Sequence, residues 1–157
     1  MPKTAIYPGT FDPITLGHFD VIERALHLFD KVVVAVATSE SKKPLFDIAK
    51  RVAMIQASVA HLDNVTVKPF NKLLVDFVKE NGSNIIVRGL RNSSDFEYEL
   101  QLDYVNHSLN KEIETVYLMP YLEHTHISSS IVRTLLSFDS DVKKMLPKEI
   151  LSMVRES

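Results

Sequence analysis

The sequence predicts an α/β fold, a single domain built on five parallel strands with helices on both faces of the sheet. Short apolar runs alternate along the chain with longer segments in which apolar residues recur at helical spacing. The run VVVAVA at 32–37 is apolar throughout, as in a strand that is buried on both faces. The chain has 157 residues, a normal length for one domain. Strands that alternate with helices form right-handed crossovers, and these produce a parallel sheet covered on both sides.

The first half of the chain is predicted to form three strands and two helices. The segment 18–29 favours a helix because its apolar residues recur on one side and its polar residues on the other. Asp47 is a suitable N-cap for the second helix, since its carboxylate can accept a hydrogen bond from the first turn. The expected strands are 4–7, 32–37 and 65–67, and the expected helices are 18–29 and 47–60.

The second half is predicted to add two strands and four helices. Gly82 can end the helix before it in a left-handed conformation, and Pro147 suits the first turn of a helix. The expected strands are 85–88 and 115–118. The expected helices are 73–81, 95–109, one that starts near 129, and a last one over about 147–155 that packs on the single domain 1–157.

The helix predicted at 95–109 has two apolar stripes on nearly opposite sides. The first comprises Tyr98, Leu102, Val105 and Leu109, and the second Phe96, Leu100 and Tyr104. One stripe can face the sheet. The other then needs a partner, which is either another helix of the chain or another subunit.

Composition excludes several classes of protein. A net charge of −2 argues against broad binding of nucleic acid, which needs a basic face. The longest apolar run, at 32–37, is too short to span a bilayer, and the first residues contain no apolar core of signal-peptide length. The absence of cysteine excludes disulfides, thiolate nucleophiles and zinc–thiolate sites. We therefore expect a cytoplasmic protein with neither a membrane nor a nucleic acid as partner.

The loops that follow the predicted strands contain most of the obvious cationic and hydroxyl side chains. Ligands of parallel sheets bind outside the carboxyl ends of the strands, where these loops lie. The N-terminus of a helix adds unpaired N–H groups and a partial positive charge, which suit phosphate. The residues concerned are Thr10, His18, Lys42, Lys43, Arg88, Arg91, Ser128, Ser129 and Ser130. The sequence thus predicts an anion site on one edge of the sheet.

Short sequence motifs, both absent and present, limit which phosphate chemistry the site can perform. The chain contains neither GxGxxG nor GxxxxGK[ST], which disfavours a dinucleotide-binding dehydrogenase and a P-loop kinase. Instead TLGH at 15–18 and ISSSIVR at 127–133 resemble the paired (H/T)xGH and ISS(S/T)xxR motifs of the nucleotidyltransferase superfamily. With YPGTFDPIT, SKKP, RGLR and DFEYE in this order, essentially the whole chain resembles the bacterial phosphopantetheine adenylyltransferase family.

This resemblance implies a Rossmann-like fold and a defined reaction. The adenylyl group of ATP would pass to 4′-phosphopantetheine, giving dephospho-coenzyme A and pyrophosphate in coenzyme A biosynthesis. The attack would be direct and in line, with no covalent enzyme intermediate. Mg²⁺ would be held mainly by phosphates and water rather than by protein ligands. The family also implies a homohexamer and feedback binding of coenzyme A.

The resemblance also implies roles for individual residues. His18 would stabilise the charge that develops on the α-phosphate. The implied catalytic residues are Thr10, His18, Lys42 and Arg91. The implied residues for the acceptor substrate are Thr10, Lys42, Leu74 and Arg88. The implied ATP-binding residues are Thr10, Phe11, His18, Gly89, Leu90, Arg91, Glu99, His124, Thr125, His126, Ile127, Ser128, Ser129 and Ser130.

Several alternatives stay open at this point. A sibling enzyme could use the same motifs on nicotinamide mononucleotide or glycerol 3-phosphate. A fragment of a class I aminoacyl-tRNA synthetase would contain motifs of the same kind. A non-catalytic nucleotide sensor would bind ATP without releasing pyrophosphate. His124 and His126 are two residues apart, and two histidines so placed can bind one metal ion. A loop that flanks the nucleotide is nevertheless the preferred interpretation. Lys72 and the stretch YLEHTH at 121–126 depart from the family pattern.

Overall fold

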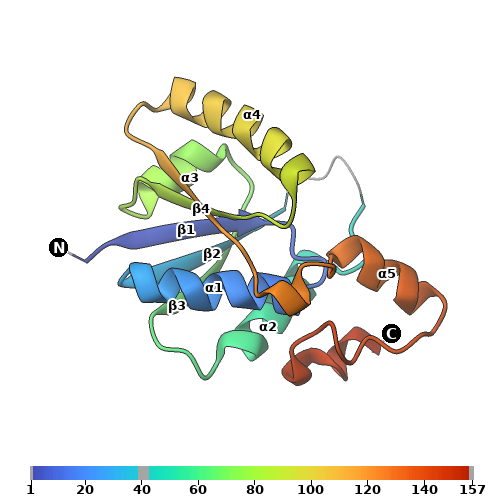
Figure 1. Ribbon diagram of the computed structural model, residues 1–157. Helices are drawn as coiled ribbons and strands as arrows, with labels where there is room; N and C mark the ends of the chain where they lie inside the picture. The colour runs from blue at the N-terminus through green and yellow to red at the C-terminus, as the bar shows by residue number, and fades with distance from the viewer. Residues whose placement is uncertain (1, 39–42, 156–157) are drawn as a thin grey trace.

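The computed structural model describes residues 2–38 and 43–155 and confirms the α/β prediction (Figure 1). Five strands form one sheet in the order β3-β2-β1-β4-β5, and every neighbouring pair is parallel. The chain runs from β1 outward to β3 on one side and then returns to add β4 and β5 on the other side. The strands are β1 (Thr4–Gly9), β2 (Lys31–Ala37), β3 (Val65–Phe70), β4 (Ile85–Gly89) and β5 (Glu114–Leu118).

Helices cover both faces of this sheet. Figure 1 shows α3 and α4 above the sheet and α1 and α2 below it, with α5 beside the carboxyl ends of the strands. The helices are α1 (Leu16–Leu28), α2 (Ile48–Val59), α3 (Leu74–Glu80), α4 (Ser93–Leu109) and α5 (Ser129–Ser137), and a short 3₁₀ helix spans Leu122–His124. Within the described residues, no helix has the length and the apolar character needed to cross a membrane.

The alternation of side chains along the strands explains the continuous apolar run in β2. Val32, Val34 and Val36 join the core that packs against α1 and α2. Val33 and Ala35 join the second core, on the side of α3. A strand with helices on both faces has no solvent side, so every position from 32 to 36 must be apolar.

Most of the predicted boundaries shift by only one or two residues, and two larger differences have physical reasons. β3 continues through Pro69 to Phe70, which is possible because β3 is an edge strand and needs no N–H at position 69 for a second neighbour. The single helix predicted at 147–155 is wrong. The segment forms two 3₁₀ helices, Lys148–Ile150 and Met153–Arg155. Pro147 supplies no side-chain cap for a longer helix, yet the two turns still bury Ile150 and Val154 in the core.

α4 lies over the edge of the sheet and departs from the expectation that one of its apolar stripes is buried. None of its residues, all of which the structure describes, is buried. Tyr98 is 62% exposed and Tyr104 67% exposed, so members of both stripes face outward. The helix instead contacts β5 through a hydrogen bond from Thr115 to Asp103 and an edge-to-face contact between Phe96 and Tyr117.

Candidate active site

A pocket of about 340 Å³ opens at the carboxyl ends of β1 and β4. Strand order reverses between these two strands, because β2 and β3 lie on one side of them and β5 on the other. This is the position at which open α/β sheets bind their ligands. The walls come from the loop after β1, the start of α1, the loop after β4, α4, and the N-terminus of α5.

The pocket brings together many of the residues that the sequence singles out. Those that line it are Phe11, His18, Arg88, Gly89, Arg91, Glu99, Ile127, Ser128, Ser129 and Ser130. Among the described residues, the lining does not include Thr10, Leu74, Leu90, His124, Thr125 or His126. Lys42 lies outside the described residues. The sequence reasoning missed the further lining residues Tyr7, Pro8, Gly9, Thr15, Gly17, Asp95 and Pro120.

His18 is held by a reciprocal cap at the start of α1. The backbone N–H of Thr15 donates to Nδ1 of His18 at 2.9 Å, and the N–H of His18 points back to the Thr15 hydroxyl at 3.4 Å. The ring of Phe11 packs against the imidazole, with 4.9 Å between the ring centroids. A nitrogen that accepts a hydrogen bond carries no proton, so the neutral ring has its proton on Nε2. The cap therefore leaves an N–H donor on the ring nitrogen that does not face Thr15.

The surroundings of His18 keep its imidazole neutral. Burial, and then the charges of Arg91 and Arg88, lower the pKa of His18 to about 4. Both causes disfavour the protonated ring. At neutral pH the side chain is thus a neutral hydrogen-bond donor rather than a cation or an acid.

This lowered pKa has a consequence for stability. In the unfolded chain His18 binds a proton near its ordinary pKa of about 6.5, whereas the folded protein accepts it only near pH 4. The protein should therefore lose stability as pH falls from about 6.5 to 4, by up to about 3 kcal/mol from this group. Urea unfolding at pH 7, 6, 5 and 4 measures the loss. The loss should be smaller by that amount in His18→Gln, and equal losses in the two proteins would contradict the assignment.

The two arginines of the pocket are each paired with a carboxylate of α4. Arg88 binds Glu99 through two hydrogen bonds, from Nε at 2.6 Å and from Nη2 at 2.8 Å. Arg91 binds Asp95 from Nε at 3.1 Å. Arg91 also donates to the backbone oxygen of Ile127 at 3.3 Å. Glu99, predicted to contact the nucleotide, is thus engaged with Arg88, and the pocket is less positive than its arginines alone suggest.

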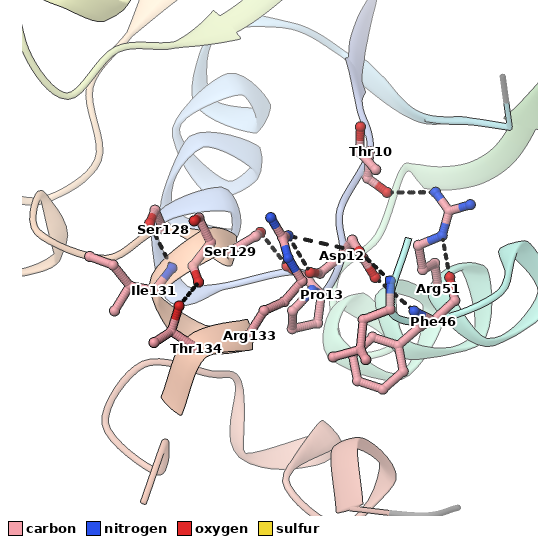
Figure 2. A network of polar contacts seen from close by, with 12 residues as sticks. Thr10, Asp12, Pro13, Phe46, Arg51, Ser128, Ser129, Ile131, Arg133 and Thr134 are labelled. Atoms are coloured by element: carbon pink, nitrogen blue, oxygen red, sulfur yellow. Dashed lines mark hydrogen bonds and ion pairs between the residues drawn. The ribbon is translucent and has the colours of Figure 1, made fainter. Parts of the chain in front are cut away.

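The three serines at the start of α5 have different tasks. Ser128 is the N-cap, and its hydroxyl accepts a hydrogen bond from the N–H of Ile131. The Ser129 hydroxyl donates to the backbone oxygen of Pro13 at 2.7 Å, which ties α5 to the loop after β1 (Figure 2). Because the N–H groups of a helix's first turn have no partner within the helix, those of Ser129 and Ser130 can be offered to an anion.

The segment 120–127 is fixed to α1 by a buried carboxylate. Asp20 accepts hydrogen bonds from the backbone N–H of Tyr121 at 3.0 Å and from Nδ1 of His124 at 2.6 Å. His124 therefore points to Asp20, and His126 is exposed. In the part of the chain that the structure describes, no three His, Cys, Asp or Glu side chains lie close enough to hold a metal ion.

Comparisons with known proteins agree with this geometry. A family model described as cytidylyltransferase-like matches residues 6–135. The chain is 55% identical to a phosphopantetheine adenylyltransferase of Campylobacter curvus and 56% identical to one of Campylobacter concisus, with 99% of each chain covered in both cases. It is 54% identical to one of Nautilia profundicola, over 96% of this chain and 98% of the relative.

A solved structure supports the fold independently. The lipopolysaccharide core biosynthesis protein of Thermoplasma volcanium superposes with a TM-score of 0.59 at 25% sequence identity. The match covers 77% of this chain and 99% of that protein.

Proposed function

The chain belongs to the cytidylyltransferase-like family, in its phosphopantetheine adenylyltransferase branch, and on that premise we propose that the adenylyl group of ATP passes directly to 4′-phosphopantetheine. An oxygen of the pantetheine phosphate attacks the α-phosphorus in line. The bond between the α-phosphorus and the bridging oxygen breaks, and pyrophosphate leaves. The attacking oxygen is already ionised at neutral pH, so the step needs neither a protein nucleophile nor a general base.

The hydrogen bond from the Thr15 N–H to Nδ1 of His18 is the observation that best supports this mechanism, because it leaves the proton of the neutral ring on Nε2. His18 lines the pocket, and its Nδ1 is occupied by the N–H of Thr15. Nε2 is then the ring nitrogen that can donate to a non-bridging oxygen of the α-phosphate. Negative charge increases on that oxygen as the five-coordinate transition state forms, so a fixed donor lowers the barrier.

The other predicted site residues would bind the two substrates. The N–H groups of Ser129 and Ser130 and the guanidinium of Arg91 would bind the β- and γ-phosphates. Arg88, Thr10 and Lys42 would hold the acceptor phosphate, with Leu74 beside the pantetheine arm. Two unit charges 4 Å apart repel by about 4 kcal/mol at an effective dielectric constant of 20, so these cations are needed to bring the two anions together.

The proposal also covers the metal ion, the oligomeric state, the location and a competing ligand. Asp95 and Glu99 are engaged with arginines, so Mg²⁺ would enter with ATP and be held by phosphate oxygens and water. We also propose a homohexamer, a cytoplasmic location, and coenzyme A as a competitor for the acceptor site.

Pyrophosphate release from ATP and Mg²⁺ tests the proposal directly. The acceptors to compare are 4′-phosphopantetheine, nicotinamide mononucleotide and glycerol 3-phosphate. We expect turnover with 4′-phosphopantetheine alone. Turnover with another acceptor instead would identify a sibling enzyme, and ATP binding without turnover on any acceptor would identify a nucleotide sensor. Either result would overturn the proposal.

A further inference from the structure

Asp12 makes buried contacts that the chemistry of the pocket does not require. It lies in the loop after β1, is 3% exposed, and is not among the described residues that line the pocket. Its two carboxylate oxygens accept hydrogen bonds from the backbone N–H groups of Leu45, at 2.7 Å, and Phe46, at 2.9 Å (Figure 2). A buried carboxylate thus binds two consecutive N–H groups more than thirty residues away along the chain.

Arg51 fixes the same two segments from the other side. From the first turn of α2, its Nε donates to the backbone oxygen of Phe46 at 2.9 Å. Its Nη1 donates to the backbone oxygens of Thr10, at 2.9 Å, and Ala37, at 3.0 Å. Phe46 is therefore held by its N–H through Asp12 and by its carbonyl through Arg51. Figure 2 shows the ends of β1 and of the segment before α2 joined by this network.

The opposite side of the loop after β1 is bound to α5. Arg133 donates from Nη1 to the backbone oxygen of Asp12 at 2.8 Å, beside the contact between Ser129 and Pro13. The loop also contains Phe11, whose φ of 51° is a left-handed conformation and whose ring packs on His18. Hydrogen bonds thus connect residues 10–13 to α5 on one side and to the segment 45–46 on the other.

We propose that Asp12 is a positioning residue for the adenylyl transfer. By binding the N–H groups of Leu45 and Phe46, its carboxylate fixes the segment that leads into α2 to the loop that carries Thr10, a residue that the proposed function assigns to the acceptor. It does this without touching either substrate. The inference rests on the proposed function, because it assigns Asp12 to the acceptor half of that same site.

The arrangement predicts that the Asp12 carboxylate affects turnover of the acceptor and does not affect the binding of ATP. When the Asp12 side chain changes, α5 keeps the contact of Ser129 with Pro13 and that of Arg133 with the backbone oxygen of Asp12. The carboxylate itself lies 3.8 Å from Nη1 of Arg133, whereas it accepts hydrogen bonds at 2.7 and 2.9 Å from the N–H groups of Leu45 and Phe46. A small displacement of the loop that carries Thr10 lowers the rate strongly, because in-line attack depends on the position of the attacking oxygen.

Asp12→Asn is the informative substitution. Asparagine has the same shape, but its amide NH₂ must face one of the two N–H donors, so one hydrogen bond becomes a clash of donors. We expect kcat/KM for 4′-phosphopantetheine at saturating ATP to fall by at least about tenfold. The Kd for ATP should change by less than about threefold, and hydrogen exchange of the amides at 45 and 46 should become faster.

Asp47→Ala is the matched control. Asp47 belongs to the same stretch of chain and accepts a hydrogen bond from the N–H of Lys50 at 2.8 Å, but it faces α2 rather than the loop after β1. Losing this N-cap should lower thermal stability without changing kcat/KM for the acceptor. If Asp12→Asn does not fold, Asp12→Glu, which keeps the charge and displaces the oxygens by one methylene, is compared in the same way.

The possible outcomes separate the two proposals. A wild-type protein that releases no pyrophosphate with 4′-phosphopantetheine overturns the proposed function, and the assignment of Asp12 to the acceptor site falls with it. An active wild type with Asp12→Asn equal to Asp47→Ala in kcat/KM overturns the role of Asp12 alone. Equal losses in acceptor kcat/KM and in ATP affinity would also overturn it, because they indicate general loosening of the fold.

Discussion

Replacing His18 by alanine is expected to lower the rate of pyrophosphate release by at least about a hundredfold. The substitution removes the neutral Nε2–H donor that the cap of α1 holds in the pocket. It leaves the arginines and the start of α5 in place, so ATP should still bind. Steady-state turnover with 4′-phosphopantetheine, together with the Kd for ATP, measures the two effects separately.

Two other substitutions at this position test the tautomer. The amide nitrogen of Gln lies close to the position of Nε2, whereas that of Asn lies close to Nδ1. His18→Gln should therefore keep more activity than His18→Asn or His18→Ala. His27→Ala, at an exposed position on the same helix, should leave turnover unchanged. Near-normal turnover in His18→Ala would mean that the histidine has been assigned wrongly.

The fold could be predicted well because each strand and helix has a strong local pattern. A strand buried on both faces must be apolar throughout, and the run at 32–37 has no other simple explanation. Asp47 caps α2 as its side chain suggests. The segment at 147–155 lacked such a pattern, because a proline was its only helix signal and a proline supplies no side-chain cap.

The start of α1 has a cap that differs from its usual sequence signature. The helix begins at Leu16, two residues before the predicted start, because Thr15 and His18 form the reciprocal cap. The usual sequence signature of such a cap has Glu or Gln at its fourth position. Histidine fills that place here, since Nδ1 can accept a hydrogen bond as a carboxylate does.

The candidate site could be placed from the loop rule, but its pairings could not. The rule brought His18, Arg88 and Arg91 to one edge of the sheet because it depends only on strand direction. Which carboxylate meets which arginine depends on how α4 is rotated over the edge of the sheet. That rotation is a tertiary feature, and the two stripes of α4 gave no unique answer. The contacts of Asp12 could not be predicted for a similar reason, because its partners at 45 and 46 are backbone groups without a sequence signature.

Arg88→Ala is the second substitution for which we expect a large effect. Glu99 has a side chain only 11% exposed and is bound to Arg88 through both carboxylate oxygens. Without the guanidinium, an unpaired carboxylate faces a pocket that must hold phosphates. Truncating one member of a buried charge pair costs about 2–5 kcal/mol, so kcat/KM for 4′-phosphopantetheine should fall by at least about thirtyfold.

The double variant Arg88→Ala/Glu99→Gln separates the two causes of that loss. In Arg88→Ala the unpaired carboxylate of Glu99 also repels the phosphates of ATP and lowers the affinity for ATP. Neutralising Glu99 removes this repulsion, so that affinity should return to within about threefold of the wild type. The acceptor loses its own cation in both variants, so its kcat/KM should stay low. Arg155→Ala, which breaks an exposed pair with Asp139, is the control and should leave turnover unchanged. If the double variant also regains full kcat/KM for the acceptor, Arg88 serves to neutralise Glu99 and does not bind the acceptor phosphate.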